Sequence, residues 1–148
     1  IKYYGHYKMA LEYGSLLGKE ISSCHRFDTV DMLVPVPLHW FKKLQRGYNQ
    51  SELLCRGIAQ SFPRPICTQV LYRKKYTTTQ THKNRLQRQD NMIGVFGINN
   101  AQTLEGKHIL LIDDVITSGA TTCSCWEALK QIPGIQISIA SLAIVANP

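Results

Sequence analysis

The chain has 148 residues, 44% of them hydrophobic, so it can bury a sizeable core and a wholly disordered protein is excluded. No apolar run is long enough to span a membrane and no signal-peptide pattern opens the sequence, so we expect a cytoplasmic protein without membrane insertion. The net charge is +7, and eleven of the seventeen Lys and Arg residues lie between His39 and Asn91 with only two acidic residues. Such a basic region suits a pyrophosphate ligand or a nucleic-acid backbone equally well.

Five cysteines are spread along the chain. Their number is odd and no Cys-x-x-Cys pair occurs, which favours reduced thiols over a metal site. Cys123 and Cys125 fall in a predicted helix, where residues at this spacing lie on different faces, and this argues against a shared ligand role.

The first predicted element is a helix within residues 1–21. Apolar residues recur there at helical spacing and predict a face turned toward the core: Met9, Tyr13, Leu16, Leu17 and Ile21. Gly14 and Gly18 lie inside this pattern, and glycine is a poor helix former, so we expect a helix that is not fully straight.

A short strand and a second helix are predicted next. Residues 31–37 form a largely apolar run in which Pro35 and Pro37 lack an amide donor, so we expect strand pairing to stop there. Residues 38–47 are rich in basic and aromatic side chains and are interpreted as a cationic loop. Asn49 is a favourable N-cap for the helix that follows it.

The middle of the chain combines short apolar segments with one long polar segment. Residues 66–72 predict a second strand, residues 95–98 return to the core, and residues 136–145 predict the last strand. Between the first two, residues 73–91 are polar and basic and have almost no apolar anchors. A segment of this length inside a compact domain is usually a functional lid or a disordered region. We interpret it as a lid that would exclude water from a reaction.

Residues 108–122 are the most informative stretch. Residues 109–112 are an apolar run typical of a strand buried on both faces, and Asp113 and Asp114 follow directly. The small and hydroxyl-bearing residues 117–121 then lead into a helix. Free amide groups at a helix N-terminus suit a phosphate, whereas two adjacent carboxylates suit sugar hydroxyls or a hydrated magnesium ion.

One ligand satisfies both halves of this stretch. Phosphoribosyl pyrophosphate carries a 5′-phosphate, sugar hydroxyls and a pyrophosphate that binds magnesium. The stretch resembles the signature of type I phosphoribosyltransferases. The alternative is an ordinary buried strand followed by a capped helix, with the two acids as loop residues.

Further motifs extend the resemblance over most of the chain. They are Pro35-Val36-Pro37-Leu38-His39, Arg46-Gly47-Tyr48-Asn49-Gln50, the spaced set Leu71, Arg73, Thr77, Gln80, Arg88 and Asn91, and the run from Ile112 to Thr121. In this order they resemble the ComF family of phosphoribosyltransferase-like proteins, which is tied to competence for DNA uptake in bacteria. Members usually carry a zinc-binding, cysteine-rich stretch before this domain; we expect it to be absent here, and no zinc in this chain.

The resemblance implies a fold and a domain organisation. The fold would be α/β, a type I phosphoribosyltransferase fold in which a central, mostly parallel sheet is flanked by helices and carries a flexible hood loop. Residues 1–148 would form a single domain, with the hood at about residues 73–95. Residues 77–79 are all threonine where relatives often have prolines, which would change the stiffness of the hood.

The resemblance also implies roles for individual residues. Asp113, Asp114 and Arg88 are the candidate catalytic residues; the two aspartates would hold the ribose hydroxyls close to a magnesium ion that the ligand carries, with no side chain bound directly to the metal. The other candidate residues for binding phosphoribosyl pyrophosphate are Val115, Thr117, Ser118, Gly119, Ala120, Thr121, Pro37, Leu38, His39, Lys42, Arg46 and Gly47. The candidate hood residues are Arg73, Thr77, Gln80, Arg88 and Asn91.

We therefore expect a magnesium-dependent phosphoribosyltransferase with a role in DNA uptake and natural transformation. A non-catalytic sensor of phosphoribosyl pyrophosphate stays open, because its loop would be identical and little of the chain is left to build an acceptor pocket. A single-stranded-DNA-binding competence factor also stays open, since residues 39–91 combine basic and aromatic side chains. The expected partners are the ligand itself, single-stranded DNA, and other competence proteins such as a DNA-uptake helicase.

Overall fold

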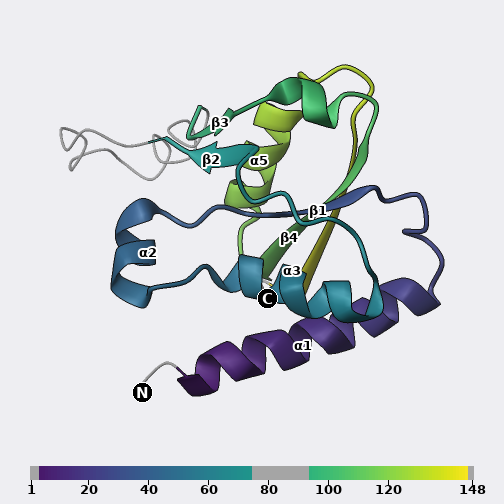
Figure 1. Cartoon of the computed structure of the whole chain (residues 1–148). Coiled ribbons are helices and arrows are strands. Elements are labelled where there is room, and N and C mark those ends of the chain that lie inside the picture. The colour runs from purple at the N-terminus through teal and green to yellow at the C-terminus, as the bar shows by residue number, and fades with distance from the viewer. Residues whose placement is uncertain (1–3, 75–93, 147–148) are drawn as a thin grey trace.

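The computed structural model describes residues 4–74 and 94–146, and its elements form three layers (Figure 1). A sheet in the middle separates helices α1 (Tyr4–Ser23) and α3 (Gln50–Ser61) from a layer that contains helix α5 (Ala120–Leu129). The remaining elements are β1 (Met32–Pro35), α2 (Trp40–Arg46), β2 (Leu71–Arg73), β3 (Phe96–Ile98), the 3-10 helix η1 (Ala101–Leu104), β4 (His108–Ile116) and β5 (Gln136–Ile144). Within the two described ranges, none of the helices has both the length and the apolar character needed to cross a membrane.

Among the described residues, the central sheet has three parallel strands in the order β1, β4, β5. The side chains of residues 109–112 are fully buried, as predicted for an apolar strand covered on both faces. The amide of Val36 donates to the carbonyl oxygen of Ile112 at 2.8 Å, so pairing continues one residue past Pro35. The predicted last strand is confirmed as β5, which pairs with β4 from His108 to Ile116.

Helices α1 and α3 cover one face of the sheet and touch through their backbones. A Cβ atom on Gly14 would lie 2.5 Å from the carbonyl oxygen of Leu54, and one on Gly57 would overlap the carbonyl oxygen of Leu11. Gly18 makes the same kind of contact with α3 one turn further along. Residues with a side chain cannot fit at these positions, so the glycines let the two helices approach closely.

The first predicted helix is confirmed, but the face assigned to the core is partly wrong. Met9, Tyr13 and Leu16 are 46%, 47% and 56% exposed, whereas Gly14 and Gly18 are buried. Because α3 packs on the glycine side of α1, the larger apolar side chains remain on its flank.

The opposite face of the sheet is covered by α5 and by an antiparallel pair formed by β2 and β3. Cys125, Leu129 and Ile132 are buried there, as the helical spacing predicts. The predicted strand over residues 66–72 is too long, because β2 begins only at Leu71. Upstream of β2, the chain makes an isolated parallel bridge between Ile66 and β1.

Residues 38–47 are not a continuous loop, which corrects the expectation for this segment. Residues 40–46 form helix α2, which projects from the left of Figure 1. The ring of His39 accepts a hydrogen bond from the amide of Phe41 at 3.2 Å and so caps the helix. Gly47 ends it with a φ of 77°, in the left-handed region that favours glycine. Local caps at both ends explain why this polar segment is helical.

Candidate functional site

The two predicted acidic residues lie toward the carboxyl end of β4, beyond the last residue that pairs with β1. Asp113 is 9% exposed and Asp114 is half-buried. Each carboxylate accepts a hydrogen bond from the next backbone amide: Asp113 from Asp114 at 2.9 Å, and Asp114 from Val115 at 2.8 Å. These bonds fix both side chains close to the backbone. The edge therefore presents oxygen acceptors to any group that binds above it.

The environment of Asp113 raises the pKa of its carboxyl group. Burial is the main cause that raises the pKa of Asp113 to about 6, and the side chain of Asp114 raises the pKa as well. The backbone amide of Asp114 and a hydrogen bond from the side chain of Ser51 act in the opposite direction. Asp113 is therefore a carboxyl group that changes charge close to neutral pH.

A tight turn between β4 and α5 surrounds a small hollow beside Asp113. The hollow, called the turn hollow here, has a volume of about 30 Å³. Its lining residues are Asp113, Val115, Ile116, Thr117, Ser118, Gly119, Ala120, Thr121 and Thr122. The structure thus gathers all the residues predicted for this stretch except Asp114 around one space.

The conformation of the turn directs the start of α5 toward the turn hollow. Gly119 has a φ of 80° and occupies the N-cap position, where it has no side chain to bond the first amides of the helix. The hydroxyl of Ser118 accepts a hydrogen bond from the amide of Ala120 at 3.3 Å, and Thr122 donates to the carbonyl oxygen of Gly119 at 3.0 Å. The first-turn amides of a helix have no partner within the helix and attract anions.

A second, larger cavity adjoins the acidic pair on the side of α1. It has a volume of about 470 Å³ and is called the α1 cavity here. Its lining residues are His6, Met9, Ala10, Tyr13, Arg46, Tyr48, Gln50, Leu54, Asp114, Val115 and Leu142. Val115 lines both spaces, so the turn hollow and the α1 cavity lie next to each other.

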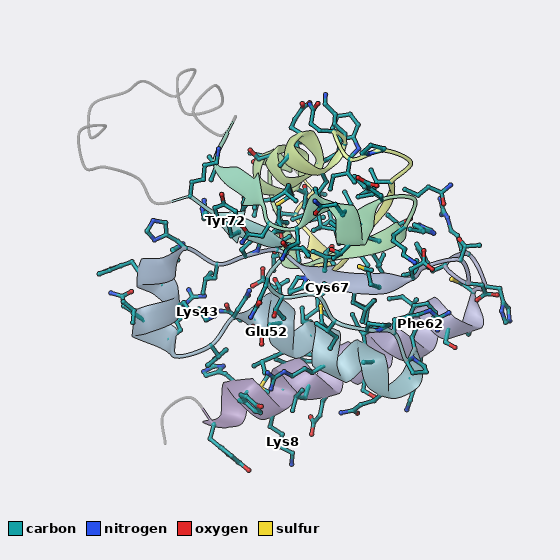
Figure 2. All side chains as sticks on the ribbon, turned by 45° about the horizontal axis from the view of Figure 1, so that its top comes forward. Lys8, Lys43, Glu52, Phe62, Cys67 and Tyr72 are labelled. Atoms are coloured by element: carbon teal, nitrogen blue, oxygen red, sulfur yellow. The ribbon has the colours of Figure 1, made fainter. Side chains whose placement is uncertain are left out.

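The predicted cationic residues after β1 are only partly brought to the acidic pair. Arg46 lines the α1 cavity together with Asp114. Five other predicted residues line neither the turn hollow nor the α1 cavity: Pro37, Leu38, His39, Lys42 and Gly47. His39 serves instead as the N-cap of α2, and Lys42 is exposed on that helix. Figure 2 places Lys43 on the same projecting helix.

Among the predicted hood residues, only Arg73 belongs to the described part of the chain. Its guanidinium lies 5.5 Å from the ring centre of Phe96, in cation–π range, and its Nε atom is buried without a described hydrogen-bond partner. Burial and the charge of Asp113 raise the pKa of the Cys125 thiol to about 12, and the charge of Arg73 opposes this rise. Thr77, Gln80, Arg88 and Asn91 lie outside the described residues.

Within residues 4–74 and 94–146, no three His, Cys, Asp or Glu side chains gather in a way that could hold a metal ion. Cys123 is exposed and Cys125 is buried, so the prediction that they lie on different faces is confirmed.

Two residues contribute to the site in ways that the sequence did not reveal. The sequence predicts Asn49 as an N-cap and as part of the Arg46–Gln50 motif. Its side chain accepts from the amide of Ser51 at 3.0 Å and also donates to the carbonyl oxygen of Val36 at 3.0 Å. It thereby ties the start of α3 to the end of β1. The side chain of Ser51 in turn forms a hydrogen bond with Asp113. In the sequence, Ser51 is marked only by its position directly after the Arg46–Gln50 motif.

Comparison with curated proteins shows which relatives share this sequence. The chain is 27% identical over 126 residues to competence protein F of Haemophilus influenzae, which covers 84% of this chain and 55% of the relative. It is 32% identical over 99 residues to the DNA utilization protein YhgH of Salmonella typhi, covering 67% and 43%. It is 33% identical over 116 residues to competence protein ComFC of Bacillus subtilis, covering 78% and 45%. The chain thus spans about half the length of these relatives.

Comparison with solved structures shows the fold. The glutamine phosphoribosylpyrophosphate amidotransferase from B. subtilis superposes with a TM-score of 0.58 at 16% identity, covering 89% of this chain and 26% of that chain. Adenine phosphoribosyltransferase from Saccharomyces cerevisiae gives 0.57 at 11% identity, covering 96% and 70%. The predicted type I phosphoribosyltransferase fold is therefore confirmed.

The family comparison agrees with the fold and with the relatives. The family described as "Phosphoribosyl transferase domain" matches residues 49–148, which include α3, the acidic pair, the turn hollow and β5. The resemblance to competence proteins predicted from the motifs is confirmed by the distant homology to competence protein F and ComFC. The chain belongs to the phosphoribosyl transferase domain family.

Proposed function

We propose that the protein binds phosphoribosyl pyrophosphate at the carboxyl end of β4 and transfers its phosphoribosyl group. One observation carries the proposal: the acid pair lies beside a turn hollow that the start of α5 faces. The turn, with its hydroxyls and first-turn amides, would hold the 5′-phosphate. Asp113 and Asp114 would accept hydrogen bonds from the ribose hydroxyls.

Magnesium fits the chemistry of these two carboxylates. They are hard oxygen donors of the kind that Mg²⁺ prefers, and a nearby cation would favour the ionised form of Asp113, whose pKa burial raises to about 6. Asp113 and Asp114 would lie around a hydrated ion that the ligand brings. When bound, the ion would neutralise charge on the departing pyrophosphate.

The residues of the chain would contribute positioning more than covalent chemistry. In the proposed reaction a nucleophile bonds to the anomeric carbon while the bond from that carbon to the pyrophosphate oxygen breaks. The turn and the acid pair would hold the sugar in position during this displacement. Arg46 would place a positive charge beside Asp114. Arg88 is proposed as the hood residue that pairs with the pyrophosphate, since a forked guanidinium suits that group.

Calorimetry on the folded protein tests binding and separates it from turnover. We expect heat on adding phosphoribosyl pyrophosphate with Mg²⁺. We expect an affinity about a hundredfold lower when Asp113 and Asp114 are both replaced by alanine, because two charged hydrogen-bond acceptors are lost. The matched control is Asp28→Ala, since Asp28 is an exposed carboxylate that pairs only with His25 in the described structure. Equal heat for the double variant would contradict the proposal.

Turnover is measured as pyrophosphate release after adding candidate acceptors. Release that depends on one acceptor would establish the transferase, whereas binding without release from any acceptor would favour the sensor.

A role in DNA utilization, including single-stranded DNA binding, is proposed as a second function. The names of the relatives support it, and so does the surface of α2. Phe41 and Leu44 are 51% and 74% exposed there, next to Lys42, Lys43 and Arg46, a combination of apolar and cationic side chains that suits single strands. Affinity for an oligonucleotide that falls steeply with salt would support this role, and no measurable affinity at low salt would contradict it.

A further inference from the structure

Strand β5 lies at an open edge of the central sheet. Within residues 4–74 and 94–146, it pairs with β4 on one side and with no strand on the other. The opposite edge is covered, because the backbone of Leu33 in β1 donates to the carbonyl oxygen of Pro65 at 2.8 Å and accepts from the amide of Cys67 at 2.9 Å. The described part of the sheet can therefore add a further strand along β5.

The sequence of β5 lacks the features that usually protect an edge strand. Such strands commonly carry lysine, another charged residue or proline, each of which hinders pairing with a second chain. Residues 134–146 contain no charged residue and no proline. Three large apolar side chains of β5 are also exposed: Ile139 at 40%, Leu142 at 41% and Ile144 at 71%. A long, uncharged and apolar edge is a surface that favours pairing with another strand.

A groove beside β5 extends this apolar surface toward α1. It has a volume of about 820 Å³ and is called the β5 groove here. Leu17 on α1 and Phe27 just after this helix line it together with Ile139 and Ile144. Among the described residues that line the groove, Glu20 alone is charged. The group that covers the groove should therefore be largely apolar.

A second copy of the chain has the charge and the symmetry that this surface requires. Two β5 strands that pair antiparallel are related by a two-fold axis, so each residue faces a residue of the same uncharged segment. No like charges then meet across the pair, although the whole chain has a net charge of +7. The same symmetry keeps both α1 helices on one face of the joined sheet and brings the two grooves together along the seam.

The length of the edge also matches the area that a stable dimer needs. Strand β5 has nine residues, which at about 3.3 Å per residue give an edge about 30 Å long. A stable interface buries roughly 800 Å² on each partner, which corresponds to a patch about 30 Å across. The edge together with the β5 groove can therefore supply an interface of ordinary size.

We infer that β5 and the β5 groove form the interface of a homodimer. Two copies pair antiparallel through their β5 edges and join their sheets into one continuous sheet, in the order β1, β4, β5, β5, β4, β1. Apolar side chains of each copy then cover the β5 groove of the other. This inference goes beyond the proposed function and does not depend on which ligand the acidic pair binds.

Sedimentation velocity on the whole chain over a range of concentrations tests the inference. We expect a species with twice the 16.8 kDa mass of one chain that dissociates on dilution. Ile144→Lys should raise its dissociation constant about a hundredfold, because the substitution adds a like charge to each copy at the seam. The 71% exposure of Ile144 means that a lysine there stays solvated in the monomer, so the fold should be retained.

Leu44→Lys is the matched control, since Leu44 is a 74% exposed aliphatic residue on α2 that does not line the β5 groove. It should leave the dissociation constant unchanged, and circular dichroism checks that both variants fold. A wild type that is monomeric at every concentration would overturn the inference. A dimer that the two substitutions weaken equally, or that neither weakens, would overturn it as well.

Amide hydrogen exchange in the wild type locates the interface without any substitution, and it decides the question even if Ile144→Lys does not fold. We expect the amides of β5 to exchange more slowly at concentrations where the dimer forms than after dilution. Exchange of β5 that is independent of concentration would overturn the inference. Slow exchange of β5 in a monomer would show that another segment of the chain covers the edge, with the same consequence.

Discussion

The crossing of α1 and α3 and the carboxyl end of β4 use glycine and burial in opposite ways. At the crossing, Gly14 and Gly57 remove side chains so that two backbones fill the space completely. At the end of β4, the Cβ of a residue at position 119 would meet little, and Gly119 is needed for its left-handed φ of 80° instead. The first region is closed and apolar, and the second keeps space open beside a buried carboxyl group.

The difference indicates where the molecule gains and loses stability. Close packing at the crossing stabilises the fold, whereas burial of Asp113 disfavours its charged form and so lowers stability at neutral pH. Adding a side chain at the crossing should therefore lower the free energy of unfolding, whereas removing the charge of Asp113 should raise it at neutral pH.

The largest effect is expected for Gly57→Ala. A methyl group there would overlap the carbonyl oxygen of Leu11, and backbone cannot move aside as a flexible side chain can. We expect the free energy of unfolding to fall by about 3 kcal/mol, as for overpacking in a rigid core. Chemical denaturation followed by circular dichroism measures this.

Gly5→Ala is the matched control for that change. Gly5 lies in the same layer, within α1, but a Cβ there would meet nothing within 4 Å. Alanine is the better helix former, so a small gain in stability of up to about 1 kcal/mol is expected. If the two variants had the same stability, the crossing would not be as tightly packed as described.

A smaller effect of opposite sign is expected for Asp113→Asn. The pKa of Asp113 is raised from 3.8 to about 6 by burial, so the native state holds a proton between these values that the unfolded state releases. Wild-type stability should therefore decline as the pH rises from about 4 to 6. Asparagine removes this dependence, and we expect the variant to be about 2 kcal/mol more stable at pH 7 and similar to the wild type near pH 4.

Unfolding curves measured across this pH range check the sign, with Asp28→Asn as an exposed control. The same variant is expected to bind phosphoribosyl pyrophosphate more weakly at pH 7. Wild-type affinity should also fall as the pH drops below about 6, because the acceptor becomes protonated. A variant that is less stable than the wild type at pH 7 would contradict the account of Asp113.

The smallest effect on stability is expected for Gly119→Ala. Alanine at a φ of 80° is strained, and a loss of about 1 kcal/mol follows from the left-handed conformation alone. Gly106→Ala is the matched control, since Gly106 has a φ of 67° and open space around it in another turn. Both variants should lose similar stability by thermal unfolding, but only Gly119→Ala should weaken phosphoribosyl pyrophosphate binding by calorimetry.

Sequence patterns predicted the elements that depend on local signals. The apolar run before Asp113 identified β4, and Asn49 identified the start of α3, because burial on both faces and capping leave marks within a few neighbouring residues. Motif order then identified the family. The acidic pair and the turn could be placed together because they are contiguous in the chain.

Features that depend on distant segments could not be predicted in the same way. The spacing of Gly14 and Gly18 was visible, but it was interpreted as a weakness of the helix, since nothing local indicates that a second helix packs on them. Similarly, the exposed side chain of Tyr13 lines the α1 cavity only because α1 lies beside the end of β4, and nothing in the local sequence indicates this. Helix α2 was missed because its caps, His39 and Gly47, are weaker sequence signals than the charge around them.

The strand order has a consequence for the route by which the chain folds. Strands β4 and β5 and helix α5 are contiguous, whereas β1 joins β4 across a sequence separation of 77 residues, as measured by the bond of Asp31 to His108. Closing so large a loop is entropically slow, so the contiguous unit should collapse first and β1 should dock late. The turn hollow would then exist before the helix pair that later encloses the α1 cavity.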